Sequence, residues 1–208
     1  MSITLDDSSK AALPGGINID LTKFLDYYEL GGLPRFLFKR LLNKPLETLK
    51  KKSGRSKIIF LYVHTNEHFE FGCVNPSIIL DATRGLVATY TDLTNDGGEA
   101  TSVIKIEQVT EPVFHDMAFK DMEEVATVSL YQQDETNENA RAWKDFKPLL
   151  PHLFTADLGK CDAMKKRLNS AEWKCLHEGL KQIPNVHEEG LYHVNLDSEL
   201  TDQTYITE

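Results

Sequence analysis

The chain has too few cysteines for a disulfide framework. Its 208 residues include three, Cys73, Cys161 and Cys175, and no two of them form a Cys-x-x-Cys pair. A sparse, odd set of thiols is typical of a reducing compartment, and a finger-type zinc site needs closely spaced thiolate pairs. We therefore expect a cytoplasmic protein with neither a disulfide framework nor a zinc finger.

Long apolar runs are also missing. The first 16 residues are polar and acidic, with Asp6 and Asp7 among them, and they lack the apolar core of a signal peptide. No other stretch approaches the roughly 20 apolar residues that a membrane-spanning helix needs. The sequence thus predicts no transmembrane segment.

Positive charge is scarce over the whole chain. Lys and Arg number 23 against 32 Asp and Glu, which gives a net charge of -9 at pH 7. Nucleic-acid binding needs a positive field to meet phosphates, so this balance argues against it. The apolar share of 41% and the charged share of 26% are ordinary for a globular protein.

Motifs for catalysis, nucleotide binding and cofactor binding are missing too. Gly97-Gly98 stands in a turn beside Asp92, Asp96 and Glu99, without the strand–loop–helix setting of a phosphate loop. These carboxylates also lack the spacing of a calcium loop. We expect no cofactor.

Helical signals are present at both ends of the chain. Asp20 is placed to cap a helix whose apolar residues recur at helical spacing, and Pro34 and Pro45 are placed to open two further short helices. Toward the C-terminus, the pattern predicts a helix over 158–168 and another capped by Ser170.

Between these regions, residues 57–107 follow the two-residue period of strands. Apolar runs at 58–63, 69–73, 78–80, 86–91 and 103–106 are separated by turn signals and predict a five-strand meander. Short connections make neighbouring strands antiparallel. Further strands are expected at 125–131 and 190–196, and a short helix at 140–146. The pattern predicts an α+β fold: an antiparallel meander sheet, curled or barrel-like in one version, with N-terminal and C-terminal helices packed against it.

The expected organisation is one α+β domain with two appendages. Residues 1–17 form a flexible lead, 18–196 form the domain, and 197–208 form a polar, frayed tail. An alternative boundary falls near residue 134.

Charge is distributed unevenly along the chain. Residues 35–57 carry nine basic side chains and one acid, a net +8, which leaves -17 for the remainder. Apolar residues between 36 and 42 accompany this charge. The segment can be the solvated back of a core helix, a surface for a protein partner or for self-association, or, least favoured, a peripheral membrane contact. The candidate binding residues are Arg35, Lys39, Arg40, Lys50, Lys51 and Lys52.

His64, His68 and Cys73 form the one compact group of chemically versatile side chains. A hairpin would bring the two imidazoles together as weak metal-ligand candidates. The same hairpin would pair Cys73 with His64 as a weak candidate nucleophile and base, with Asn75 orienting the ring. Ordinary hairpin histidines and a buried structural thiol are the favoured alternatives.

Two functions follow from these features. The first is a non-catalytic binding or interaction protein that engages a partner through the basic segment 35–57 and the acidic remainder. The alternative is an enzyme of low motif content, hydrolase-like, with a pocket near His64, His68 and Cys73.

Overall fold

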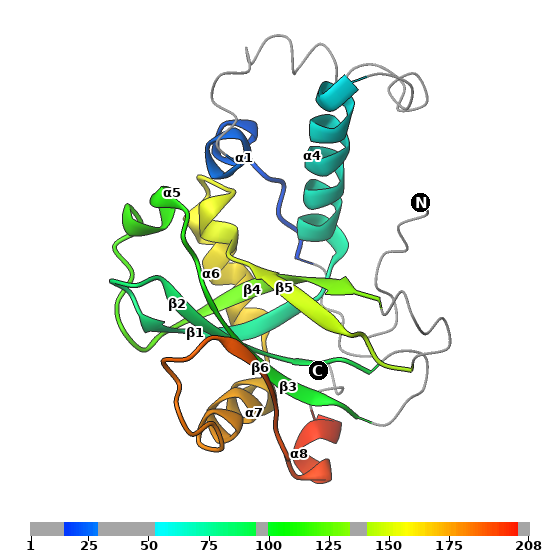
Figure 1. The fold of residues 1–208 in the computed structure, drawn as a ribbon, viewed down its shortest axis with the longest axis vertical. Helices are drawn as coiled ribbons and strands as arrows, with labels where there is room; N and C mark the ends of the chain where they lie inside the picture. Colours follow the sequence, from blue (N-terminus) through cyan, green and yellow to red (C-terminus); the bar gives the residue numbers. More distant parts are fainter. Residues whose placement is uncertain (1–14, 29–52, 95–99, 134–140, 204–208) are drawn as a thin grey trace.

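The structure, a computed structural model, describes residues 15–28, 53–94, 100–133 and 141–203 (Figure 1). It has an α+β fold built on one six-stranded antiparallel sheet. The strands are β1 (Val74–Asp81), β2 (Leu86–Asp92), β3 (Ser102–Gln108), β4 (Glu123–Gln132), β5 (Asp145–Leu149) and β6 (Gly190–His193). The helices are α1 (Leu21–Tyr27), α4 (Ser53–Phe71), α5 (Pro112–His115), the 3-10 helix η1 (Pro151–Leu153), α6 (Leu158–Arg167), α7 (Ser170–Leu180) and α8 (Ser198–Gln203).

The strand order in the sheet is β5-β4-β1-β2-β3-β6. Strands β1, β2 and β3 follow one another as a meander, whereas β4 returns to the far side of β1 and β5 pairs with β4. The expected α+β fold with an antiparallel, curled sheet and flanking helices is confirmed. The alternative boundary near residue 134 falls between β4 and β5, two strands that pair with each other.

Two of the expected strands, at 58–63 and 69–73, are wrong. Residues 53–71 form a single helix, α4. The prediction failed because a short apolar run fits a buried helix as well as a buried strand. Thr65, Asn66 and Glu67, which stand between these two expected strands and were expected to form the turn joining them, lie within the helix. The Thr65 hydroxyl donates to the Leu61 carbonyl at 2.7 Å, and Asn66 Oδ1 accepts from the Ile19 amide at 3.0 Å.

Three smaller expectations also change. The expected helix at 140–146 is instead the approach to strand β5, which buries Phe146. Asn169, not Ser170, caps α7, and it forms a capping box with Glu172. The expected frayed tail contains α8, whose Leu200 is buried.

At the N-terminus, the structure confirms the helix cap that the sequence predicts. Asp20 caps α1 as predicted, because its carboxylate accepts from the Thr22 and Lys23 amides. Ile17, at the end of the expected lead, is buried, and its amide donates to the Phe69 carbonyl at 3.1 Å. The helices expected after Pro34 and Pro45, and the turn at 95–98, lie outside the described residues.

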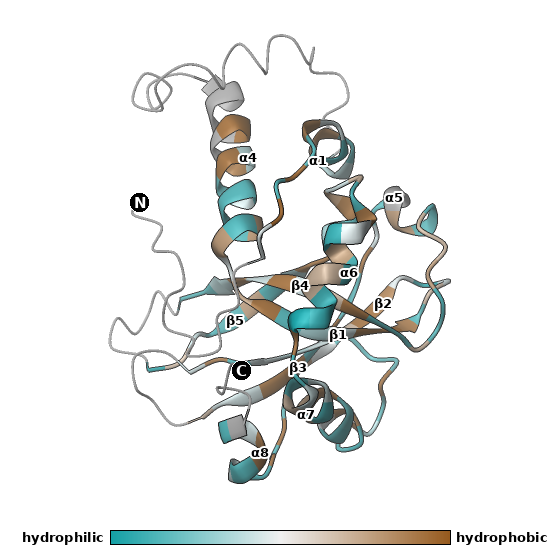
Figure 2. Cartoon of the chain, turned by 180° about the vertical axis from the view of Figure 1, so that it is seen from behind, coloured by the Kyte–Doolittle hydropathy of each residue, from teal (hydrophilic) through white to brown (hydrophobic). Residues whose placement is uncertain are grey.

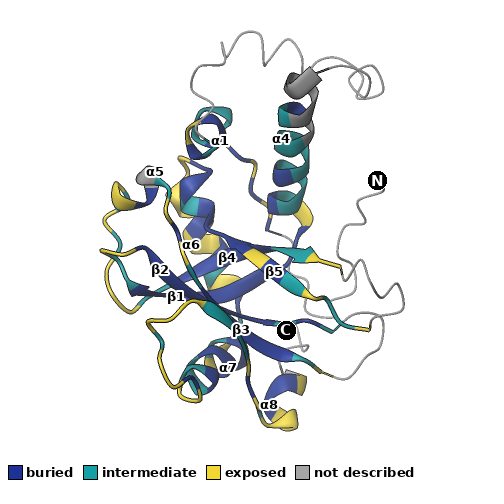
Figure 3. Ribbon diagram, in the orientation of Figure 1, coloured by how far each residue is buried: buried dark blue, intermediate teal, exposed yellow. Residues whose placement is uncertain are grey.

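Helices cover one face of the sheet, and α1 and α4 stand at one end of the molecule. Helix α6 packs on β4, and α7 packs on β1, β2 and β3. Figure 2 shows α6 as largely hydrophilic, which agrees with Cys161 and Met164 being its buried residues. Figure 3 shows β1 and β2 buried along nearly their whole length, so these strands are covered on both faces.

Candidate functional site

The face of the sheet opposite α7 carries buried hydroxyl groups. In the register of the strands, Ser77 on β1 stands beside Thr89 on β2, and its Oγ lies 2.7 Å from Thr89 Oγ1. The same Oγ lies 2.8 Å from Thr127 Oγ1 on β4. All three side chains are fully buried. Because buried hydroxyls are costly unless they are hydrogen-bonded, this cluster links the three central strands.

The polar row continues toward one end of these strands. The Asn75 amide nitrogen donates to Ser129 Oγ at 2.8 Å and to Tyr131 OH at 3.4 Å. Tyr131 OH in turn lies 2.6 Å from Thr91 Oγ1. A second layer of polar side chains therefore spans β1, β2 and β4 on the same face.

Lys105 on β3 crosses this face to reach β5. Its Nζ lies 2.9 Å from Asp145 Oδ1 and 3.0 Å from Oδ2, and it donates to the Phe146 carbonyl as well. Strands β2, β1 and β4 lie between β3 and β5 in the sheet. The sheet is therefore curled so strongly that its two sides meet through this ion pair.

A small hydrophobic cluster joins the same two sides of the curled sheet. Leu93, Val103 and Phe146 are buried together, and the Trp143 amide donates to the Leu93 carbonyl at 2.7 Å. An isolated bridge joins Thr94, just after β2, to Ala142, just before β5. These contacts hold the end of β2 against the start of β5.

The face of the sheet opposite α7 lies inside the curl, and we call it the inner face. Its carboxyl group with the most strongly raised pKa is that of Glu107. Burial raises its pKa from 4.5 to about 7, against the opposing effect of Lys105, whose Nζ lies 3.9 Å from Glu107 Oε2. Burial, with an added contribution from Glu111, also raises the pKa of Tyr27. Perturbed acids gather at functional sites, but buried structural networks perturb them equally. The inner face can hold a proton near neutral pH, while Lys105 is committed to Asp145.

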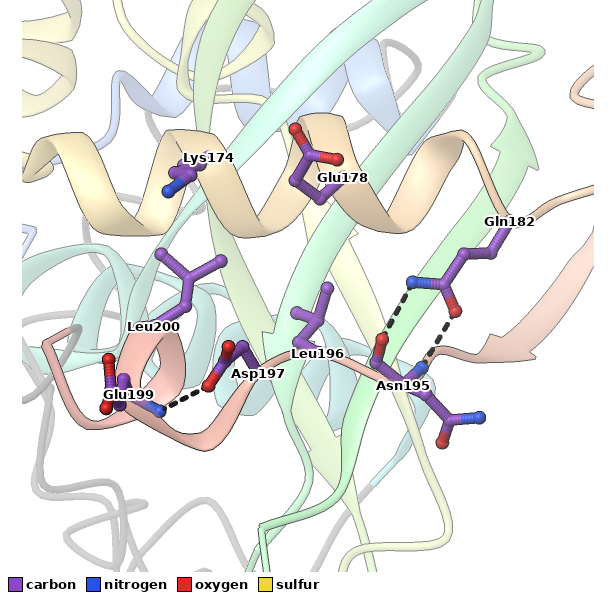
Figure 4. A pocket seen from close by; sticks show the side chains of 8 residues that line it. All are labelled: Lys174, Glu178, Gln182, Asn195, Leu196, Asp197, Glu199 and Leu200. Carbon is purple, nitrogen blue, oxygen red and sulfur yellow. Dashed lines mark hydrogen bonds between the residues drawn. The ribbon is translucent and has the colours of Figure 1, made fainter.

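A groove between α7 and α8 is the second candidate site (Figure 4). It encloses about 350 Å³ and is lined by Lys174, Glu178, Gln182, Asn195, Leu196, Asp197, Glu199 and Leu200. Two hydrogen bonds fix one wall: Gln182 Nε2 donates to the Asn195 carbonyl at 2.8 Å, and the Asn195 amide donates to Gln182 Oε1 at 2.9 Å. Asp197 Oδ1 accepts from the Glu199 amide at 2.9 Å and so starts α8.

The groove carries a small excess of negative charge. Its lining holds the acids Glu178, Asp197 and Glu199 against one cation, Lys174. On the α7 side, Lys181 Nζ lies 2.7 Å from Glu178 Oε1, and this hydrogen bond lowers the pKa of Glu178. Leu196 and Leu200 supply apolar surface beside these charges. A small negative excess of this kind is complementary to a positively charged group on a partner.

The residues singled out from the sequence are placed differently. Arg35, Lys39, Arg40, Lys50, Lys51 and Lys52 lie outside the described residues. His64 and His68 lie on one face of α4, not on a hairpin, with ring centroids 5.3 Å apart. His64 Nδ1 lies 3.7 Å from Glu67 Oε2. Among the residues that the structure describes, no group of three or more His, Cys, Asp or Glu side chains is placed to hold a metal ion.

Cys73 lies just before β1 and is buried. The strand expected at 69–73 would place Phe69, Phe71 and Cys73 on one apolar face, but Phe69 is buried in α4 while Phe71 is 52% exposed. Asn75 directs its amide to Ser129 and Tyr131 and not to His64. The hairpin on which the hydrolase-like alternative was based is therefore replaced by helix α4.

The sequence reasoning missed both candidate sites. Lys105 and Glu107 alternate with Ile104 and Ile106, so the pattern itself signals two charged side chains on one face of β3. Their partner Asp145 gave no such signal, because the region around it resembled a helix. The groove depends on α8, in a segment whose polar composition suggested a frayed tail.

Comparison with known proteins adds one structural likeness. No family model matches the chain, and no curated protein matches it. It is similar to a crystal structure described as that of a "putative membrane protein" from Corynebacterium diphtheriae, with 16% sequence identity and a TM-score of 0.48 over 58% of this chain and 99% of that one. Within the described ranges, no helix of this chain combines the length and apolar content needed to cross a membrane.

Proposed function

We propose that this chain is a non-catalytic binding protein that engages a protein partner through charge complementarity. One contact surface is the basic segment 35–57, and the other is the acidic groove between α7 and α8. The cysteine content favours a cytoplasmic setting.

The observation that carries the proposal is the composition of the groove. Glu178, Asp197 and Glu199 outnumber the one lining cation, Lys174, and Leu196 adds apolar surface, so a partner meets a mainly polar lining with a negative excess. Charges at an interface steer a partner of opposite charge. The uneven charge, +8 in residues 35–57 and -17 elsewhere, adds a long-range field to both surfaces.

The contacts on the inner face of the sheet also favour the groove as the recognition site. Its ionisable groups contact one another, since Lys105 binds Asp145 and lies close to Glu107. The hydroxyls of Ser77, Thr89 and Thr127 are likewise bonded together. These contacts make the inner face a structural network, which leaves the groove as the better candidate for recognition.

Affinity purification from cells, with two variants, tests the proposal. The first variant changes Arg35, Lys39, Arg40, Lys50, Lys51 and Lys52 to Ser, and the second is Glu178→Lys/Glu199→Lys. Partners bound by the wild type should be lost from one or both variants, and binding should weaken as salt is raised. The control is Asp116→Lys/Asp162→Lys, which makes the same charge change at exposed positions outside the groove. Equal recovery of the same partners by all four proteins would contradict the proposal.

A further inference from the structure

We infer that Lys105 switches between two carboxylates: ionisation of Glu107 draws it away from Asp145 and so loosens the contact between β3 and β5. Protonation of Glu107 leaves Lys105 to Asp145 alone. The contact between the two sides of the curled sheet is therefore sensitive to pH. This inference concerns the inner face and does not depend on the proposed binding function.

The distances place Lys105 between the two carboxylates. Its Nζ lies 2.9 Å from Asp145 Oδ1 and 3.9 Å from Glu107 Oε2. Asp145 belongs to β5, whereas Glu107 is two residues beyond Lys105 on β3, so Lys105 and Glu107 project from the same face of that strand. A lysine side chain is long and flexible and carries a compact charge. A rotation of this one side chain can therefore exchange one partner for the other.

The charged and titratable groups that face Glu107 come from α1, β3, β5 and the segment before α5: Tyr27, Lys105, Asp145, Lys147 and Glu111. Burial raises the pKa of Glu107 from 4.5 to about 7, and the two lysines only partly oppose this. Tyr27 donates a hydrogen bond to Glu111, and burial raises the pKa of the Tyr27 hydroxyl. Tyr27 therefore stays neutral at the pH where Glu107 changes charge.

The direction of the effect follows from these contacts. Above about pH 7, Glu107 bears a charge although its side chain is only 21% exposed, so it needs a nearby cation, and Lys105 is in place to supply one. A shift of Lys105 toward Glu107 stabilises the ionised form and lowers the pKa of the Glu107 carboxyl. The form with Lys105 shifted thus holds the proton less tightly, and by linkage its population rises with pH.

The start of β5 is the part of the molecule that responds. This strand lies at one end of the strand order, where β4 is its neighbour in the sheet. Lys105 joins it to β3 through the Asp145 carboxylate and the Phe146 carbonyl. A shift of Lys105 weakens both contacts, so β5 should open locally more often and its backbone amides should exchange hydrogen faster.

Hydrogen exchange of the full-length protein, followed by mass spectrometry between pH 5.5 and 8, tests the inference. The rates are first corrected for the intrinsic pH dependence of amide exchange. Peptides covering 141–149 should then lose about tenfold in protection as the pH rises through 7, since a difference of one pKa unit between the two forms corresponds to about tenfold. This loss should exceed any change in peptides from β1 and β2, which report on the centre of the sheet.

Two matched variants separate the switch from overall stability. Glu107→Gln cannot ionise, so its 141–149 peptides should keep their low-pH protection up to pH 8. Glu172→Gln makes the same chemical change on α7, at a carboxyl whose pKa burial also raises to about 7, and glutamine can keep the helix cap. This control should show the full wild-type loss over 141–149.

A third variant and the contrary outcomes complete the test. Lys105→Met removes the shared cation, so its 141–149 peptides should exchange rapidly at every pH in this range, and circular dichroism checks that each variant is folded. A wild type whose 141–149 peptides change no more than those of β1 and β2 overturns the inference. Loss of protection in Glu107→Gln equal to that of the wild type, or its equal suppression in Glu107→Gln and Glu172→Gln, overturns it as well. The comparison of the two glutamine variants decides the matter even if Lys105→Met does not fold.

Discussion

Lys105 on β3 binds Asp145 on β5 with its Nζ 2.9 and 3.0 Å from the two carboxylate oxygens, although three strands separate β3 from β5 in the sheet. This contact is possible because the sheet curls. The Lys105 side chain is 17% exposed and that of Asp145 is 35% exposed, so the pair is only partly screened by water. The ion pair joins β3 to β5 across the inner face, and we call it the Lys105–Asp145 clamp.

A double-mutant cycle measures the strength of this clamp. Lys105→Met should destabilise the fold by about 2 kcal/mol, since it leaves Asp145 and Glu107 without their cation and the Phe146 carbonyl without its donor. Asp145→Asn should cost less, because the carbonyl contact of Lys105 remains. Urea denaturation of both single variants and the double variant should give a coupling of about 1 kcal/mol. Strictly additive effects would show that the clamp contributes nothing.

The pKa of Glu107 predicts a pH dependence of stability. The folded state raises this pKa from 4.5 to about 7, so it holds the proton more tightly than the unfolded chain does. This contribution is complete below about pH 4.5 and is lost as the pH rises through about 7, with an upper limit of about 3 kcal/mol. Glu172, whose pKa burial also raises to about 7, acts in the same direction.

Glu107→Gln isolates the Glu107 contribution. Glutamine mimics the protonated carboxyl at every pH, so the variant should lose about half of the decline in unfolding free energy between pH 5.5 and 8. Urea denaturation across this pH range makes the measurement. Glu189→Gln, the same chemical change at an exposed position just before β6, is the control and should leave the decline unchanged. A Glu107→Gln protein with the full wild-type decline would refute the assignment.

The hydroxyl cluster predicts unequal costs for two small changes. Ser77 bridges Thr89 and Thr127, so Ser77→Ala removes two hydrogen bonds and should cost about 2 kcal/mol. Thr89→Val keeps the volume and leaves Ser77 bonded to Thr127, so it should cost about 1 kcal/mol or less. Thermal unfolding of both variants compares them. A larger loss for Thr89→Val would show that Ser77 is not the centre of the cluster.

Two glycines with positive φ should respond differently to alanine. Gly85 has φ +71, and an added Cβ would lie 2.3 Å from the Val109 carbonyl oxygen. Gly16 has φ +66, but its added Cβ would meet only the Arg167 side chain, at 3.7 Å. Gly16→Ala should therefore cost about 1 kcal/mol from backbone conformation alone, and Gly85→Ala clearly more, because a backbone atom must move. Chemical denaturation gives both values, and equal costs would argue against the close approach at Gly85.

Thiol labelling tests directly whether Cys73 can act as a nucleophile. Cys73, Cys161 and Cys175 are all buried, and burial raises the pKa of the Cys161 thiol to about 11. Native protein should therefore react slowly with a thiol reagent at neutral pH, and all three thiols should react after unfolding. Selective, rapid labelling of Cys73 in the native protein would favour the enzyme hypothesis over the binding protein.

Local signals in the sequence predicted local structure well. The Asp20 cap and the spacing of Phe24 and Leu25 define α1, because capping and helical periodicity act within one or two turns. The meander of β1, β2 and β3 was readable for the same reason, since short connections leave neighbouring strands only an antiparallel pairing. The error at α4 came from a short apolar run between Ile58 and Val63, which suits a strand or a buried helix equally.

The sequence by itself determined the fold class, the absence of a long apolar span and the separation of charge between residues 35–57 and the remainder. Tertiary structure alone decided that Lys105 meets Asp145, that β4 returns beside β1, and that α8 folds back to form an acidic groove with α7. Each of these contacts joins residues far apart in the chain. Spacing and composition describe neighbours along the chain, whereas the curl of the sheet and the packing of its helices bring distant residues together.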